Sequence, residues 1–169
     1  MTANDSARLR GVVRRLLHRR VPQAPGATAS EPVQRVGLDN EWPVDTPLRD
    51  DGVNVVGYLR NQLALGDAGR RIADALRHAS IPTSTLAFGA SPSPPVDPPF
   101  VADDRVGHST TLAVVAADQM PVLADWHPEL IEASRRMIGY CFWETSTLTD
   151  AGRRGLDGVG EVWAPTRFV

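Results

Sequence analysis

Short apolar runs rich in β-branched residues alternate with helical patterns after residue 52, and this alternation most restricts how the chain can fold. The runs that predict strands are 53–58, 83–88, 111–116, 137–143 and 161–164. Helical patterns lie between them at 66–79, 119–134 and 149–156, and the second of these is interrupted at Pro121 and Pro128. Strands joined by helical crossovers predict an α/β fold: a Rossmann-like, mainly parallel sheet with helices on both faces.

The first 20 residues carry a basic, amphipathic pattern. They hold six arginines and one acid, Asp5, whereas the remaining residues hold 12 arginines and 19 acids. Between Ser6, a candidate N-cap, and Pro22, apolar residues recur at the spacing of one helical face: Leu9, Val12, Val13, Leu16 and Leu17. Residues 1–20 therefore predict a basic helix. Three readings stay open: residues 6–20 lie on an anionic membrane surface, they dock on a partner, or they have no role.

Two segments rich in proline divide the rest of the chain. Residues 21–51 lack periodicity and predict a flexible linker, which leaves 52–169 as one folded domain. Trp42, inside that linker, either packs on the domain or is exposed. The stretch 91–99 has five prolines in nine positions and predicts a loop.

Composition excludes several classes of protein. All 18 basic residues are arginine, so a Walker-type phosphate loop, a Schiff-base enzyme and a protein kinase all lack their lysine. The single cysteine, Cys141, excludes a disulfide framework and a multi-cysteine metal site, and it indicates a reducing, cytoplasmic compartment. The near-balanced net charge of −2 argues against nucleic acid as a partner. No two histidines have metal-ligand spacing, so no metal is expected.

The chemistry is expected beyond the carboxyl ends of the strands, where open parallel sheets bind ligands. Arg60 follows the first strand, and Gly66 and Asp67 open the next helix. A glycine there lets backbone amides approach a ligand, and a carboxylate caps those amides; the bland reading is a turn glycine and a helix cap. The glycine spacing does not match a dinucleotide fingerprint, so no nicotinamide cofactor is expected.

Three further candidates follow the third and fourth strands. Asp118 is either the N-cap of the next helix or a polar group facing a cleft. Trp143 and Glu144 combine an aromatic face with a carboxylate, which suits the apolar CH face and the hydroxyls of a sugar, although aromatics at strand ends also commonly belong to the core. The residues themselves identify no catalytic group.

Four segments together resemble the N-terminal domain of bacterial retaining glycosyltransferases of the GT-B fold, in the broad group that includes mannosyltransferases. In chain order they read GVNVVGYLRNQLALGDAGRRIADALRHASIPTSTLAF, VVAADQMP, IGYCFWET and GEVWAPTRFV, and they cover most of 52–169. The chain departs from the family pattern at Gln62, Ala116 and Cys141. In this family the N-terminal domain mainly binds the acceptor, and a second Rossmann-like domain holds the nucleotide-sugar donor.

The resemblance implies a function and a place for the candidate residues. The loop with Arg60, Gly66 and Asp67 would line the acceptor cleft, with Asp118 and Glu144 near the acceptor. The complete protein would transfer a sugar from a nucleotide sugar to a glycan or lipid acceptor. Lacking the donor-binding half, this chain is expected to be inactive alone, either as a fragment or as a half that needs a second chain.

Two rival classes remain open at this stage. One is a stand-alone α/β binding or regulatory module without catalysis, and the other is a small nucleotide-binding α/β enzyme. The location expected for all three is the cytoplasm, either free or at the inner face of the membrane.

Overall fold

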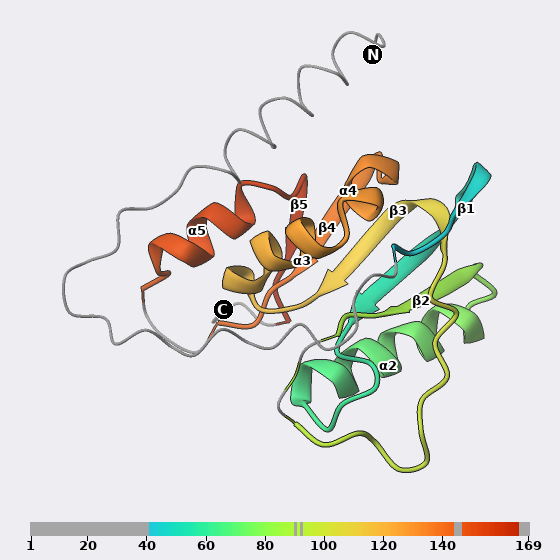
Figure 1. The fold of residues 1–169 in the computed structure, drawn as a ribbon, viewed down its shortest axis with the longest axis horizontal. Helices are drawn as coiled ribbons and strands as arrows, with labels where there is room; N and C mark the ends of the chain where they lie inside the picture. Colours follow the sequence, from blue (N-terminus) through green and yellow to red (C-terminus); the bar gives the residue numbers. More distant parts are fainter. Residues whose placement is uncertain (1–40, 90, 92, 144–146, 166–169) are drawn as a thin grey trace, which may run out of the picture.

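The computed structural model describes residues 41–89, 91, 93–143 and 147–165, which form a five-stranded sheet with helices (Figure 1). The strands are β1 (Val44–Gly57), β2 (Thr83–Ala87), β3 (Val106–Val114), β4 (Arg136–Tyr140) and β5 (Glu161–Trp163). Their spatial order is β2-β1-β3-β4-β5, and every neighbouring pair is parallel. The predicted α/β, Rossmann-like sheet is confirmed.

Helices pack on both faces of this sheet (Figure 1). They are α2 (Ala64–His78), the 3-10 turn η1 (Ala117–Gln119), α3 (Met120–Trp126), α4 (Pro128–Ala133) and α5 (Asp150–Leu156). The predicted interruption at Pro128 is confirmed, since it starts α4 after a break at His127. Pro121 instead lies in the first turn of α3, where a missing N–H leaves no helical bond unmade.

Two apolar clusters lie on opposite faces of the sheet. The cluster under α2 is centred on Val55, Ala73, Leu112, Val114 and Ile138. The cluster under α3 and α4 includes Val56, Ala113, Leu123, Leu130 and Met137. Consecutive strand residues alternate between these clusters, as the two-residue repeat of a strand covered on both faces requires.

The structure differs from the sequence prediction at the start of the domain. Residues 44–51, predicted as flexible linker, belong to β1, where Val44 pairs with Val106 and Arg49 with His108. Two register shifts interrupt this pairing, so the strand shows no regular apolar alternation by which to recognise it. Trp42 packs on the domain and is 6% exposed. The predicted helix in 1–20 and the linker up to residue 40 lie outside the described residues.

The third strand also begins earlier than predicted, at Val106 rather than residue 111. The side chain of Asn54 explains this, because it accepts from the backbone N–H groups of Gly107 and His108, each at 3.1 Å, and donates to the His108 carbonyl at 2.6 Å. These bonds join the polar start of β3 to the middle of β1. Polar residues are thereby buried in a strand that apolar patterning does not reveal.

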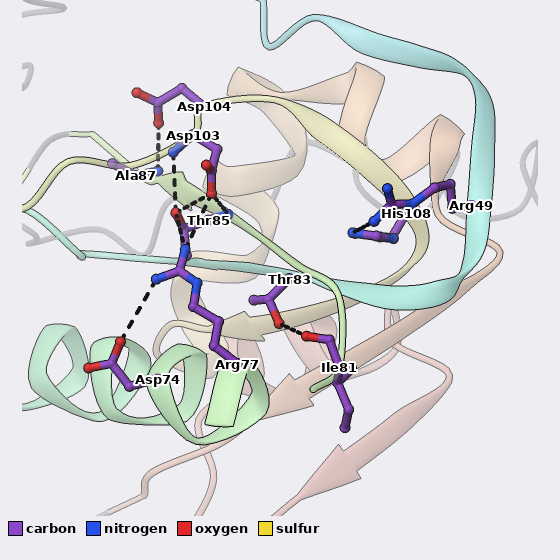
Figure 2. A network of polar contacts seen from close by, with 10 residues as sticks. All are labelled: Arg49, Asp74, Arg77, Ile81, Thr83, Thr85, Ala87, Asp103, Asp104 and His108. Carbon is purple, nitrogen blue, oxygen red and sulfur yellow. Dashed lines mark hydrogen bonds and ion pairs between the residues drawn. The ribbon is translucent and has the colours of Figure 1, made fainter. Parts of the chain in front are cut away.

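Carboxylates protect the outer edge of β2. The Thr85 N–H donates to the Asp103 carboxylate at 2.8 Å, and the Ala87 N–H donates to Asp104 at 2.9 Å (Figure 2). Arg77 of α2 lies 3.5 Å from the same Asp103 oxygen. The segment before β3 thus occupies an edge that would otherwise offer unpaired backbone groups.

The segment 91–99 contains neither helix nor strand among its described positions, which confirms the predicted loop. Among the described residues, none of the helices is long and apolar enough to cross a membrane.

Candidate functional site

The candidate site lies at the carboxyl ends of β1 and β3. The chain leaves β1 toward β2 on one side and leaves β3 toward β4 on the other, so the sheet order reverses between these two strands. Ligands of open α/β sheets bind at such a reversal, because the two connections diverge there. The loop 58–63 after β1 and the segment 115–118 after β3 flank it.

Backbone packing fixes the loop after β1. A Cβ on Gly66 would lie 2.4 Å from the Tyr58 carbonyl oxygen and 2.9 Å from that of Asn61, so no larger residue fits without movement. The Arg70 guanidinium donates to the carbonyls of Leu59 at 3.1 Å and Asn61 at 3.2 Å. The first turns of α2 therefore hold the loop against the end of β1.

The proline-rich loop forms a second layer on this rim. The Asn61 side-chain amide donates to the Ser93 carbonyl at 2.8 Å. Gln62 donates through its backbone N–H to Pro94 at 2.8 Å and through its side chain to Pro95 at 2.9 Å. These bonds join two loops far apart in sequence into one support beside the carboxyl ends of β1 and β2.

Tyr58 is a buried residue with a polar atom at this edge. Its side chain is 7% exposed, and its ring lies 5.3 Å from Phe88, which in turn lies 5.6 Å from Trp126. Burial, together with the nearby negative charge of Asp118, raises the pKa of Tyr58 to about 12. Like any tyrosine, Tyr58 keeps its phenol proton at neutral pH and can donate a hydrogen bond, while Asp118, which is exposed, can accept one.

The structure places the predicted residues of the first loop in three different settings. Arg60 is exposed and forms an ion pair with Asp104, the residue that also accepts from Ala87. Gly66 is buried, as described above. Asp67 is half-buried in the first turn of α2, and its carboxylate accepts from Arg71 at 2.7 Å.

The predicted capping role of Asp67 is wrong. The helix starts at Ala64 with Leu63 as its N-cap, and no side chain caps it. The reason is burial. Leu63 and Leu65 pack against the core, so the helix begins about one turn earlier in the sequence than predicted. The hydrogen bond from Arg71 lowers the pKa of Asp67 below its ordinary value.

Asp118 lies within η1 and is exposed, so the N-cap alternative is not realised. The N-cap of η1 is Ala116 and that of α3 is Gln119, neither with a side-chain cap bond. What remains of the sequence prediction is a polar group at the end of β3.

Trp143 belongs to a different part of the rim. Its indole N–H donates to the Thr147 carbonyl at 3.0 Å, and its ring lies 3.3 Å from where a Cβ on Gly152 of α5 would be. The α5 helix in turn packs on η1, since a Cβ on Gly155 would lie 1.7 Å from the Ala117 carbonyl oxygen. Trp143 thus supports α5, while Glu144 lies outside the described residues.

The relationship between Tyr58 and Asp118 is the part of the site that sequence reasoning missed. Tyr58 ends an apolar run and looks like a core residue, and Asp118 lies 60 positions later. The available signal was the tyrosine itself: a phenol at a strand end keeps one polar atom that needs a partner.

A metal or redox group finds no ready ligand set in the part of the chain that the structure describes. No cluster of three or more His, Cys, Asp or Glu side chains occurs there with metal-binding geometry. Among the described histidines, His108 is the most buried, at 1% exposed, and it lies in β3 toward its amino end, at the opposite edge of the sheet from the candidate site.

Comparisons with protein-family models, with curated proteins and with solved structures found no match to this chain. The residues after β1 and β3, Tyr58 and Asp118 among them, lie at the reversal of strand order in this parallel α/β sheet.

Proposed function

We propose that this chain is the acceptor-binding domain of a GT-B-type glycosyltransferase. The complete enzyme would transfer a sugar from a nucleotide sugar to a glycan or lipid acceptor. One observation carries the proposal: the four segments that resemble the family include the ends of β1, β3 and β4 and the whole of β2 and β5. Because these strands are parallel, all four segments run toward the same sheet edge.

The groups at this edge suit a hydroxyl-rich acceptor. The protonated phenol of Tyr58 is a donor and the carboxylate of Asp118 is an acceptor, which is the combination that neighbouring sugar hydroxyls can satisfy. The guanidinium of Arg60, half-exposed beside Asp104, adds further donors at the rim. The loop after β1 is held by the Arg70 guanidinium, which donates to the Leu59 carbonyl, and by the Gln62 N–H, which donates to the Pro94 carbonyl. This part of the site therefore needs little ordering when it binds a ligand.

Catalysis on this proposal requires a second domain or chain for the donor. Holding two reactants in near-attack geometry contributes about 7–11 kcal/mol to lowering a barrier, and one rim positions only one of them. The domain by itself therefore needs no cofactor and binds acceptor without turnover. A reducing, cytoplasmic location fits the buried, unpaired Cys141.

The test is a titration of the ¹⁵N-labelled chain with methyl and octyl glycosides, in which NMR measures the changes in backbone amide chemical shifts. Shifts are expected in 58–62 and 115–119, and Asp118→Asn is expected to weaken binding by about tenfold, the size of a lost hydrogen bond to a charged group. Asp125→Asn, an exposed carboxylate on α3, is the matched control and should leave the affinity unchanged.

Two results would overturn the proposal. One is a panel of glycosides that shifts no amide at this edge. The other is release of nucleoside diphosphate from a nucleotide sugar by the chain alone in the presence of acceptor.

A further inference from the structure

One face of the sheet is only partly covered. The α3, α4 and α5 helices lie on one side, whereas α2 is the one helix on the other side among the described residues (Figure 1). It packs mainly on β1, β2 and β3. Parallel sheets normally have both faces covered along their whole width. Among the described residues, the cluster under α2 reaches Ile138 of β4 but includes no residue of β5.

Aromatic side chains occupy that open part of the face. Tyr140 of β4 is the register partner of Trp163 of β5, so the two side chains point to the same side of the sheet. Phe142 lies edge-on to Tyr140 with ring centroids 5.2 Å apart. Phe142 is 37% exposed and Trp163 44% exposed. These three residues form what we term the aromatic strip.

The flank of α2 toward the strip carries three alanines and one arginine. Arg77 marks the opposite flank, because it reaches Thr85 and Asp103 at the β2 edge (Figure 2). On the β3–β4 side the helical repeat places Ala64, Ala68, Arg71 and Ala75, and the Arg71 guanidinium is paired with Asp67 of the same helix. Alanine lets a second helix lie close beside α2, so this side of the sheet has the width and the chemistry to accept one.

We propose that the occupant is residues 6–20 of this chain, docked as a helix over the aromatic strip beside α2. The sequence predicts for this segment an apolar stripe of five aliphatic residues, and an isolated helix of such length is marginal in water without a surface to bury it. The inference goes beyond the proposed function and does not depend on it.

Chain length and charge favour this occupant. Residues 21–40 join the segment to the start of the described fold and span up to about 70 Å when extended, which is ample for a domain of this size. A tether of that length keeps the local concentration of the helix high, so weak contacts are enough for docking. The segment carries six arginines and no acid, and the rest of the chain holds 12 arginines against 20 acids.

The experiment measures amide hydrogen exchange in the full chain. The stripe variant Val13→Ser/Leu16→Ser is expected to raise the amide exchange rate at 140–142 and 161–163 by about tenfold or more. In this variant β4 and β5 can open locally without first displacing the docked helix. Ala7→Ser/His18→Ser, on the opposite side of the predicted helix and with no arginine removed, is the matched control and should leave exchange there unchanged. The reciprocal variant Trp163→Ser should raise exchange within 6–20 by a similar factor. Unchanged protection at Val55 and Leu112 verifies that each variant is folded.

Three outcomes would overturn the proposal. Exchange at the strip that is the same in the parent chain and the stripe variant means that residues 6–20 do not cover it. Protection that disappears on dilution assigns the strip to a second copy of the chain. Protection of 6–20 that appears only with phosphatidylglycerol vesicles, and is insensitive to Trp163→Ser, assigns the helix to a membrane surface.

Discussion

The indole ring of Trp42 lies stacked on the imidazole of His127, with centroids 3.4 Å apart and planes 7° apart. The same pair is joined through Glu129, whose carboxylate lies 2.8 Å from the His127 Nδ1 and accepts from the Trp42 backbone N–H at 2.8 Å. Trp42 precedes β1, while His127 and Glu129 lie at the start of α4. The contact therefore fastens the chain at its entry into the sheet to a helix more than 80 residues later.

Removal of this indole should destabilise the domain. We expect Trp42→Ala to lower the free energy of unfolding by about 3–5 kcal/mol, the range for deleting a buried aromatic side chain. Val101→Ala, at a position that is 86% exposed, should change it by no more than about 0.5 kcal/mol. Urea denaturation measures both changes. A Trp42→Ala effect as small as that of the control would show that the stacking of Trp42 on His127 does not stabilise the fold.

Acid should weaken the domain through His108. Burial and the neighbouring Arg49 lower the pKa of His108 in the folded state, although the carboxylates of Asp51 and Asp45 oppose this. The unfolded chain then binds the proton more readily, so this contribution to stability is complete above the ordinary pKa of about 6.5 and decreases as pH falls below it.

The measurement is the unfolding midpoint in urea between pH 7.5 and pH 5. The parent chain should lose stability across this window, and His108→Asn, which cannot take up a proton, should lose less. Parallel pH profiles for the two proteins would contradict a neutral, buried His108.

Gly66 should tolerate no side chain. An alanine Cβ would lie 2.4 Å from a backbone oxygen, so Gly66→Ala is expected to destabilise the domain by about 1–3 kcal/mol as the loop is displaced. Gly158→Ala is the matched control, because its Cβ would meet only the Gly155 oxygen at an ordinary 3.5 Å. Thermal melts compare the two variants, and equal melting temperatures would show that the loop is not held in place at Gly66.

The carboxylate of Asp103 should protect the β2 edge. Asp103→Ala leaves the Thr85 N–H without its acceptor, and Thr85 is buried. We expect a loss of about 1–3 kcal/mol and increased self-association, since an uncovered edge strand can pair with another chain. Asp103→Asn, which retains an acceptor oxygen, should behave more like the parent. Light scattering during urea titration reports both effects, and an alanine variant that stays monomeric and fully stable would refute this role.

Apolar patterning is sufficient to predict much of the sheet because each central strand is covered on both faces. Continuous apolar runs mark the two central strands, at Val55-Val56 and at Leu112-Ala113-Val114. Pro128 breaks the helical pattern because its ring cannot be accommodated inside a helix. Alternation of such runs with helices then restricts the fold to a parallel α/β sheet.

Patterning fails where a strand is held by side chains from elsewhere in the sequence. Residues 44–51 join β1 through an irregular pairing, and the polar start of β3 is held by the amide of Asn54. No local window contains both members of either contact. The early start of α2 at Ala64 has the same origin, because Leu63 and Leu65 are drawn into a core assembled from several strands.

The sequence by itself thus determined the order and kind of the elements, which depend on residues a few positions apart. Only the tertiary structure decided that Tyr58 lies within the electrostatic reach of Asp118 and that Trp42 stacks on His127. The members of each pair are 60 or more positions apart in the sequence, and whether they come near one another depends on strand order, register and helix placement. Those features are set when the chain buries its apolar surface as a whole, and no single segment encodes them.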